Sequence, residues 1–241
     1  MIAATQTVRE IAQTKPSSIS VFEQFGIEYC CGGGKPLGEA CAAKELDVEM
    51  VIAALEVASR HGDAHTEDWT KESLASLMQH IVRTHHAYCK EELPLLSGLA
   101  AKVVNRHGGT HPELVLIQSK LAQLADELTD HLVEEEVVVF PMIVTLEAEM
   151  ASEEVRNAES PSAIGNSLEL LMAEHDTVGT LLADVRGLSC NFVPPEDACT
   201  TYQAFFDGLR EFERDIHRHV HLENNILFPR AIEIATSPLA A

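Results

Sequence analysis

The sequence contains few aromatic and few basic residues. Aromatic residues make up 5% of the 241 residues, and tracts of alternating β-branched residues are lacking, whereas stretches rich in Leu, Ala, Glu and His are long. This composition favours an all-α protein. Only 17 lysines and arginines stand against 38 acidic residues, which gives a formal net charge of −21. Because nucleic acids and anionic membranes repel such a chain, we expect neither as a partner.

The sequence also has no long hydrophobic run and no regular pattern of cysteines. Its longest apolar runs, such as VVVF and LVLI, are far too short to span a bilayer. The N-terminus has no basic region followed by an apolar one, so we expect no signal peptide and a cytoplasmic protein. The six cysteines are spaced irregularly, which does not indicate a disulfide framework, and we expect reduced thiols.

Hydrophobic periodicity divides the chain into a small helical part and a bundle. Residues 1–60 predict several short helices around the loop IEYCCGGGKP, and the polar residues 61–72 predict a linker. Residues 73–241 contain four long amphipathic patterns, which predict helices over 73–96, 112–140, 162–188 and 199–228. Four long helices joined by shorter polar loops are typical of an antiparallel four-helix bundle.

The second half of this bundle repeats the first. The stretches HLVEEEVVVFP, from His131, and HVHLENNILFP, from His219, both fit His-x-x-x-Glu-x-x-x-x-Phe-Pro. A lone histidine precedes each motif at a matching distance, His86 by 45 residues and His175 by 44. We interpret the halves as two related helical hairpins. The Phe-Pro pairs predict a kink or a frayed end in each second helix, because proline removes an i to i−4 hydrogen bond.

The doubled motif predicts a metal site. Residues four apart lie on one face of a helix, so each motif can direct an imidazole and a carboxylate at one point. A single such pair is usually only a surface pair, but two copies with matching histidines indicate a ligand set. The set holds four imidazoles and two carboxylates: His86, His131, Glu135, His175, His219 and Glu223.

This ligand set suits two metal ions, each with two histidines and both bridged by Glu135 and Glu223. Imidazole with carboxylate favours iron, manganese or zinc, and we expect two non-haem iron ions with carboxylate and oxo bridges. A ferritin-like site would use four glutamates and the motif Glu-x-x-His, which this sequence lacks.

Several neighbouring residues are alternatives or supports. His86 is preferred to His85 because it matches the seven-residue step to Leu93 that His175 makes to Leu182. We interpret the residues that flank the motifs as exposed or as supporting the ligands: Glu134, Glu136, His217 and His221.

The adjacent Cys30 and Cys31 form the second feature of interest. Three glycines follow them, so we expect an exposed, flexible loop, and a helix that begins near Pro36 would lower the pKa of a thiol. We therefore expect a reactive thiol pair, the alternative being a turn that happens to contain cysteines. The other cysteines are interpreted as structural or incidental: Cys41, Cys89, Cys190 and Cys199.

The quoted motifs together resemble one family. The stretches EYCCGGG, KELDVE, EELPLL, HLVEEEVVVFP, EHDTVGTLL and HLENNILFPRA resemble the RIC (repair of iron centres) family of hemerythrin-like di-iron proteins over about residues 8 to 231. The resemblance implies an all-α, hemerythrin-like four-helix bundle with a small N-terminal helical domain, and it places iron on the same six residues. One departure is the third glycine after the cysteines, where the family more often has two.

The resemblance also implies a function. The resemblance implies that the protein restores iron–sulfur clusters damaged by nitric oxide or oxidative stress by supplying iron, so damaged iron–sulfur proteins would be the clients. The alternatives are an enzyme that reduces nitric oxide and a protein that senses or buffers nitric oxide or oxygen. An oxygen carrier is disfavoured because hemerythrin sites have five terminal histidines and this set has four. The sequence leaves the oligomeric state open, a homodimer included.

Overall fold

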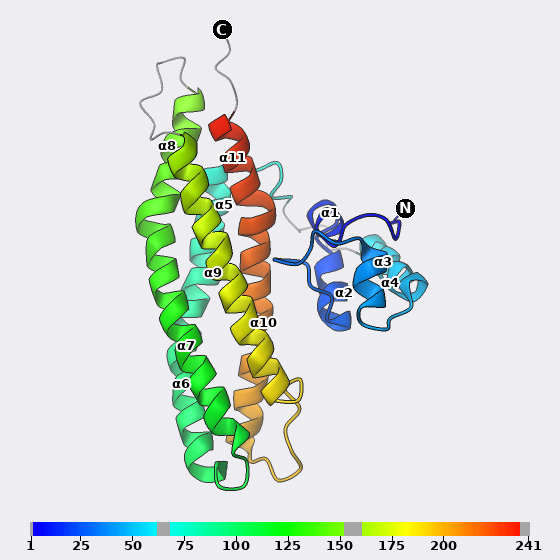
Figure 1. Ribbon diagram of the computed structural model, residues 1–241, viewed down its shortest axis with the longest axis vertical. Helices are drawn as coiled ribbons and strands as arrows, with labels where there is room; N and C mark the ends of the chain where they lie inside the picture. The colour runs from blue at the N-terminus through cyan, green and yellow to red at the C-terminus, as the bar shows by residue number, and fades with distance from the viewer. Residues whose placement is uncertain (1, 62–67, 152–160, 237–241) are drawn as a thin grey trace.

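The computed structural model describes residues 2–61, 68–151 and 161–236, and within these ranges the extended regular elements are all helices (Figure 1). The expected all-α class and four-helix bundle are confirmed. Residues 62–67 of the expected linker lie outside the described residues, as do Met1 and residues 237–241 of the expected domains. None of the helices in the described ranges is long and apolar enough to cross a bilayer.

The N-terminal part folds into four short helices around its own core. They are α1 (Val8–Thr14), α2 (Ser18–Phe25), α3 (Leu37–Ala42) and α4 (Val48–His61). Helix α1 begins with a capping box, in which the Thr7 hydroxyl accepts from the Glu10 amide and the Glu10 carboxylate accepts from the Thr7 amide. Helix α2 ends at Gly26, whose φ of +62° is a left-handed conformation that favours glycine. The apolar side chains that these helices share are buried together, among them Val8, Ile11, Phe22, Leu37 and Leu55.

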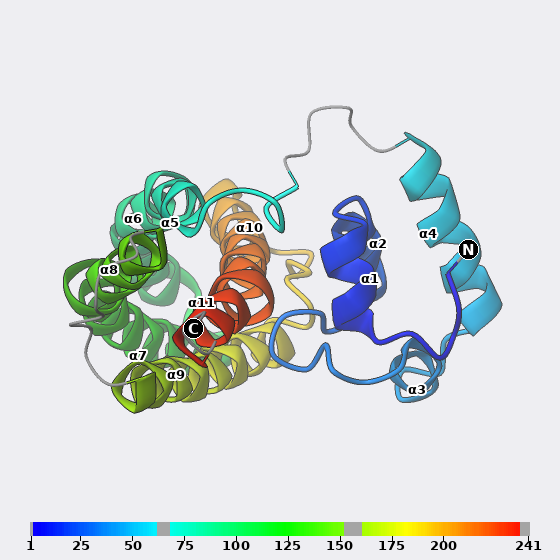
Figure 2. The same ribbon diagram turned by 90° about the horizontal axis from the view of Figure 1, so that it is seen from above.

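The bundle consists of four antiparallel rods, three of which are interrupted by a π-helical turn (Figures 1 and 2). The first rod comprises α5 (Leu74–Ile81), η1 (Val82–His86) and α6 (Ala87–His107). The second comprises α7 (Glu113–Glu134), η2 (Glu135–Val139) and α8 (Phe140–Ala151). The third is the single helix α9 (Pro161–Leu188). The fourth comprises α10 (Thr200–Leu222), η3 (Glu223–Leu227) and α11 (Phe228–Thr236).

The Phe-Pro pairs do not end the second and fourth rods. Both rods continue beyond them as α8 and α11, with Pro141 and Pro229 in the first turn, where a missing N–H is tolerated. The turn before each pair is widened, because the Phe140 amide donates to the Glu135 carbonyl and the Phe228 amide to the Glu223 carbonyl. The interruption expected at each Phe-Pro pair is therefore a π-turn, and it begins at the motif glutamate.

Two apolar cores fill the bundle, one on each side of a buried polar layer. The lower core in Figure 1 packs side chains of α6, α7, α9 and α10, such as Leu96, Leu121 and Phe205. The upper core packs α5, α8, α9 and α11 through side chains such as Leu74 and Ile143. Because each core excludes water, polar groups between them are deprived of solvent and must satisfy one another.

Candidate metal centre

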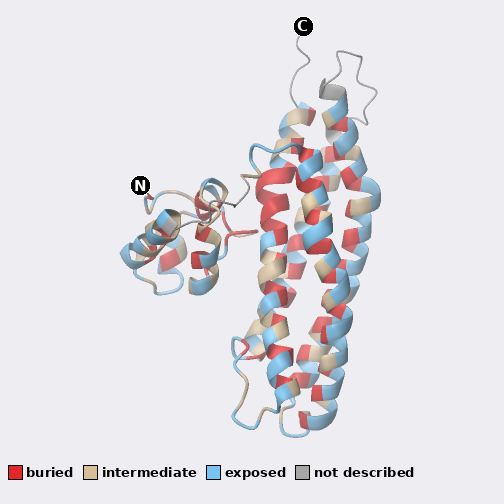
Figure 3. Ribbon diagram, turned by 180° about the vertical axis from the view of Figure 1, so that it is seen from behind, coloured by how far each residue is buried: buried red, intermediate tan, exposed pale blue. Residues whose placement is uncertain are grey.

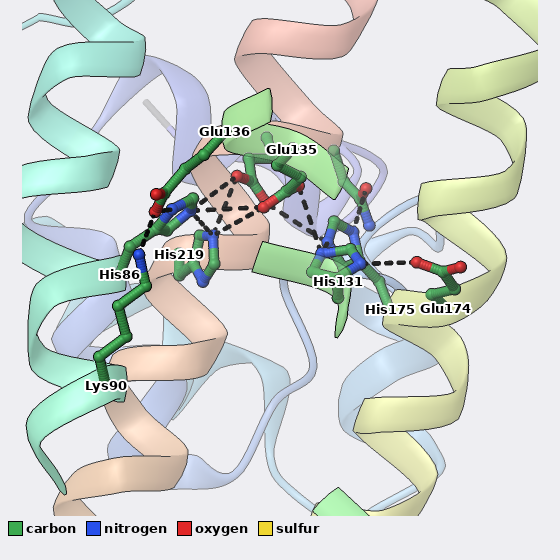
Figure 4. Close-up of polar contacts among 10 residues, drawn as sticks. His86, Lys90, His131, Glu135, Glu136, Glu174, His175 and His219 are labelled. Atoms are coloured by element: carbon green, nitrogen blue, oxygen red, sulfur yellow. Dashed lines mark hydrogen bonds and ion pairs between the residues drawn. The ribbon is translucent and has the colours of Figure 1, made fainter. Parts of the chain in front are cut away.

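The six predicted ligands meet in the polar layer between the two apolar cores (Figure 4). His86 is the last residue of η1, and Glu135 and Glu223 are the first residues of η2 and η3, so the three π-turns lie at this level. His131 lies on α7, His175 on α9 and His219 on α10. Each of the six side chains is at most 3% exposed. Single-turn π insertions are frequent at functional sites, where they redirect a side chain that a regular helix would place elsewhere.

The four imidazoles form two pairs. The Nε2 atoms of His86 and His219 are 3.1 Å apart, and those of His131 and His175 are 2.9 Å apart. The potential ligand atoms form two quartets that share the glutamates, one with His86 and His219 and the other with His131 and His175.

Each glutamate directs one oxygen towards each pair of imidazoles. Glu135 Oε2 lies 3.3 Å from His86 Nε2, whereas its Oε1 lies 3.3 Å from His131 Nε2. Glu223 Oε1 lies 2.9 Å from His219 Nε2, whereas its Oε2 lies 3.3 Å from His175 Nε2. This is the arrangement that two carboxylates need in order to bridge two cations.

Outer hydrogen bonds orient three of the four imidazoles. His86 Nδ1 is 2.7 Å from Glu136 Oε1, which also accepts from Lys90 Nζ at 2.6 Å (Figure 4). His131 Nδ1 is 2.7 Å from Glu174 Oε2, and His175 Nδ1 is 2.8 Å from Asn224 Oδ1. An Nδ1–H donated to an oxygen fixes the tautomer that leaves Nε2 free for a cation.

These outer partners repeat between the hairpins, with one exception. Glu136 follows Glu135 and its carboxylate forms a hydrogen bond with His86 Nδ1, just as Asn224 follows Glu223 and its amide oxygen forms one with His175 Nδ1. His131 is oriented by Glu174, the residue before His175.

His85 precedes His86 as Glu174 precedes His175, but it forms no hydrogen bond with the remaining imidazole, that of His219. Its Nδ1 pairs with Asp215 at 2.9 Å, and its ring stacks on His219 with centroids 5.8 Å apart. Within the described residues, His219 Nδ1 has no hydrogen-bond partner. The preference for His86 over His85 agrees with this geometry.

The buried acids and bases stabilise one another's charged forms. Burial opposes the charge of His86, but hydrogen bonds to Glu135 and Glu223 outweigh it and raise the pKa of His86 to about 10. The pKa of His131 is raised to about 9 against the same effect of burial, chiefly by Glu135. Burial favours the neutral form of Glu223 too, but the neighbouring imidazoles hold its pKa well below the usual range. The centre thus holds ionised carboxylates that require positive charge, either from protons on imidazole or from metal cations.

The unpaired atoms of the centre fit a bound cation. Among the described residues, both carboxylate oxygens of Glu135 and Oε2 of Glu223 are fully buried without a hydrogen-bond donor in good geometry. A buried carboxylate oxygen without a well-aligned donor is costly, whereas coordination to a cation satisfies it. The donor set of imidazole nitrogens and carboxylate oxygens suits iron, manganese or zinc.

The other histidines near the motifs lie outside this centre. His221 is buried, and its Nδ1 lies 2.8 Å from Asn225 Nδ2. His217 contacts the N-terminal domain, with its ring 6.2 Å from that of Tyr29.

The Cys-Cys loop is buried against the bundle rather than exposed, contrary to the expectation from its glycines (Figure 3). Cys30 is only 4% exposed, and Asn225 Nδ2 donates to the carbonyls of Tyr29 and Cys30 at 3.0 and 3.3 Å. A hydrogen bond with Cys31, burial and the Glu28 carboxylate raise the pKa of Cys30, where the sequence had suggested a lowered thiol pKa. Cys31 is half-buried and reaches the centre's surroundings, with Sγ 3.7 Å from Asn224 Nδ2. The reactivity of the pair stays a prediction.

At two of the three glycines that follow Cys31, a side chain would collide with neighbouring atoms. A Cβ at Gly32 would lie 2.6 Å from Glu28 Cγ, and one at Gly33 would lie 2.6 Å from the Tyr29 carbonyl oxygen. A Cβ at Gly34 would meet nothing within 4 Å. The third glycine, which departs from the family pattern, is therefore the one the fold does not need.

Three functional residues were missed from the sequence: Glu174, Asn224 and Asn225. Asn224 could have been found by aligning the two motifs, since it occupies the position of Glu136. Asn225 has no such signal, because the loop that it holds is nearly 200 residues away in the sequence.

Comparisons with known proteins agree with this geometry. Residues 77–231 match the family model described as the hemerythrin HHE cation binding domain, and residues 4–59 match one described as a domain of unknown function (DUF542). The iron-sulfur cluster repair protein YtfE of Escherichia coli O157:H7 is 34% identical over 227 residues, covering 94% of this chain and 96% of that protein. A probable iron-sulfur cluster repair protein of Haemophilus influenzae is 34% identical over 233 residues, covering 96% of this chain and 99% of that protein.

Three findings lead to one assignment. A family model spans most of the chain, the relatives align almost from end to end, and the matched bundle holds a buried His/Glu cluster. The chain belongs to the RIC family of hemerythrin-like iron–sulfur cluster repair proteins.

Proposed function

We propose that the protein holds two iron ions in the buried His/Glu centre and donates iron to iron–sulfur clusters damaged by nitric oxide or oxidative stress. The observation that carries this proposal is the pair of quartets, each of two imidazoles and two carboxylates, that share Glu135 and Glu223, with three carboxylate oxygens that lack a well-aligned hydrogen-bond donor. The names of the relatives support the client class, damaged iron–sulfur proteins. The six cysteines are free thiols, which suits a reducing compartment such as the cytoplasm.

Each part of the centre has a task in this proposal. His86, His131, His175 and His219 would each present Nε2 to iron, and Glu135 and Glu223 would bridge the two ions. Bound there, iron would supply an exchangeable and redox-active metal pool. The outer partners Glu136, Glu174 and Asn224 hold three of the rings in the tautomer that leaves Nε2 free. The strongly acidic surface would attract cations towards the protein.

The test is reactivation of a damaged enzyme. The full-length protein is loaded with ferrous iron without oxygen, its iron is counted, and it is mixed with a [4Fe–4S] dehydratase inactivated by nitric oxide. We expect recovery of activity with about two irons per chain, and none with the double variant Glu135→Leu and Glu223→Leu, which removes both bridges. The proposal fails if the loaded protein restores nothing while free ferrous iron with thiol restores the same enzyme.

A second candidate is binding or reduction of nitric oxide at the same centre. Each quartet offers two imidazoles and two shared carboxylates, so a six-coordinate ion would retain positions for small ligands such as nitric oxide or oxygen. Nitrous oxide formed over many turnovers, in the absence of cluster repair, would select this function over the first.

A further inference from the structure

A second cluster of metal-ligand side chains lies where the N-terminal domain meets the bundle. The carboxylate of Glu28, the thiol of Cys30 and the imidazole of His217 place one potential ligand atom each within 4.8 Å of one another. Cys30 Sγ is 2.7 Å from Glu28 Oε1. None of the three belongs to the quartets of the buried centre. We call them the seam cluster.

The seam cluster is assembled from two parts of the fold. Glu28 and Cys30 lie on the loop between α2 and α3, which reaches from the N-terminal domain to the bundle (Figure 1), whereas His217 lies on α10. Asn225 fixes the loop by donating to the carbonyls of Tyr29 and Cys30. The cluster therefore exists only when the N-terminal domain is seated on α10 and η3.

The Glu28 carboxylate is held in place by hydrogen bonds, although the residue is exposed. Its Oε1 accepts from the amides of Cys30 and Cys31 at 3.1 and 3.2 Å. The side chain folds back over Gly32, where any Cβ would collide with Glu28 Cγ. Gly32 thus makes room for a carboxylate that ends beside the thiol. Preorganised ligands lose little freedom when they bind a cation.

We propose that Glu28, Cys30 and His217 form a third, mononuclear site for a borderline divalent cation such as ferrous iron, zinc or cobalt. One thiolate, one carboxylate and one imidazole match the preferences of these ions. When the cation binds, Cys30 loses its proton to solvent and a sulfur–metal bond replaces the S–H bond. Three protein ligands leave at least one coordination position for water or for a ligand from another molecule.

The position of the seam site suggests its use, and this step rests on the proposed iron-donor function. Cys31, next to Cys30, has its Sγ 3.7 Å from Asn224 Nδ2, and Asn224 Oδ1 is 2.8 Å from Nδ1 of the ligand His175. Only two side chains therefore separate the seam site from the buried centre. A thiolate site that has one exposed ligand, Glu28, and lies so close to the buried centre suits a hand-over point for iron that leaves the protein.

A titration of the full-length apoprotein with cobalt(II), without oxygen, tests the site directly. The buried centre has no cysteine, so a thiolate-to-cobalt charge-transfer band in the near ultraviolet reports cobalt bound outside that centre. We expect one equivalent of cobalt to give this band, in addition to cobalt that binds without it. Ferrous iron in large excess should lower the band by competition, because it binds such ligands more weakly than cobalt.

Variants assign the band to its ligands. Cys30→Ser should remove it, and His217→Ala should weaken cobalt binding at this site by at least about tenfold. Cys199→Ser, which alters an exposed thiol on the bundle, should leave the band unchanged. Circular dichroism confirms that each variant is folded. The inference is overturned if the folded wild-type protein shows no thiolate band, or if the band persists in Cys30→Ser.

The repair assay separates this inference from the proposed function. A band that depends on Cys30, together with no cluster repair by the wild-type protein, would leave the seam site in place and remove the donor function. Repair by a protein without the band would retain the donor function and remove the seam site.

Discussion

The two halves of the proposed centre are built unequally, and this predicts two unequal metal affinities. At one half, His131 and His175 both have an outer acceptor, the Glu174 carboxylate and the Asn224 amide oxygen. At the other half, His86 has Glu136, but His219 Nδ1 has no partner among the described residues. An outer carboxylate fixes the imidazole and raises its basicity, which strengthens the metal bond. The His131–His175 position should therefore bind the first cation, and the His86–His219 position should hold the more labile one.

The substitution Glu174→Gln tests this reasoning at one atom pair. Glutamine keeps an acceptor oxygen but removes the charge; complete loss of an outer partner costs about 10- to 100-fold in metal affinity, which corresponds to about 1.4 to 2.7 kcal/mol. The Glu174 side chain is 35% exposed, so solvent screens its charge and we expect the lower end, about tenfold. The tighter binding step should weaken by that factor and approach the weaker one, which should hardly change.

The assay is an anaerobic titration of the apoprotein with ferrous iron or cobalt(II) in competition with a chelator of known affinity. Glu169→Gln is the matched control, because Glu169 is an exposed glutamate on the same helix and loses the same charge. Equal affinities for both buried ions in the wild-type protein would refute the reasoning. So would a Glu174→Gln variant in which both steps weaken alike, or in which only the weaker step changes.

Three further outcomes are expected. Gly33→Ala should lower the free energy of unfolding by about 1–3 kcal/mol in urea denaturation, because its Cβ would press on the Tyr29 carbonyl. The free energy of unfolding of Gly34→Ala should lie within about 0.5 kcal/mol of the wild-type value. Equal losses in the two variants would contradict the packing described. Asn225→Ala should cost about 1–3 kcal/mol in the same assay, because two buried loop carbonyls lose their donor; an unchanged midpoint would mean that water replaces the amide. A hydrogen bond from His107 lowers the pKa of the exposed Cys199 to about 7. Alkylation of Cys199, followed by peptide mass spectrometry, should therefore rise with pH through a midpoint near 7 as the thiolate forms, and His107→Ala should move that midpoint upward. A midpoint that stays in place in His107→Ala would exclude this pairing.

Local spacing was sufficient to predict which six side chains meet in the buried layer, because four-residue steps and matched hairpins are properties of single helices. The same local rules also predict the outer partner of His86, because that partner is Glu136, the residue after Glu135. They do not reach Glu174, since its contact with His131 depends on how α7 and α9 pack. The Cys-Cys loop shows that local sequence rules do not predict contacts between the two domains. Glycine and cysteine describe a flexible turn, but the burial of Cys30 depends on Asn225, a residue on another domain.

The burial pattern of the second rod contains a signal for its π-turn. An uninterrupted helix alternates steps of three and four between buried positions. Among the buried positions of this rod, His131, Glu135, Val139 and Ile143 instead follow one another in three steps of four. In the fourth rod all residues from 219 to 228 are buried, so burial shows no such spacing there. Repeated steps of four require a wider turn if the residues are to stay on one face.

Each π-turn therefore affects more than the glutamate at which it begins. One inserted residue rotates everything beyond it by about 100° relative to a continuous α-helix. Ile143 and Leu146 face the upper apolar core only because of that rotation. Deleting a single residue between 135 and 139 would turn both side chains away from the core as well as moving Glu135. The polar layer and the hydrophobic packing above it thus share one determinant of register.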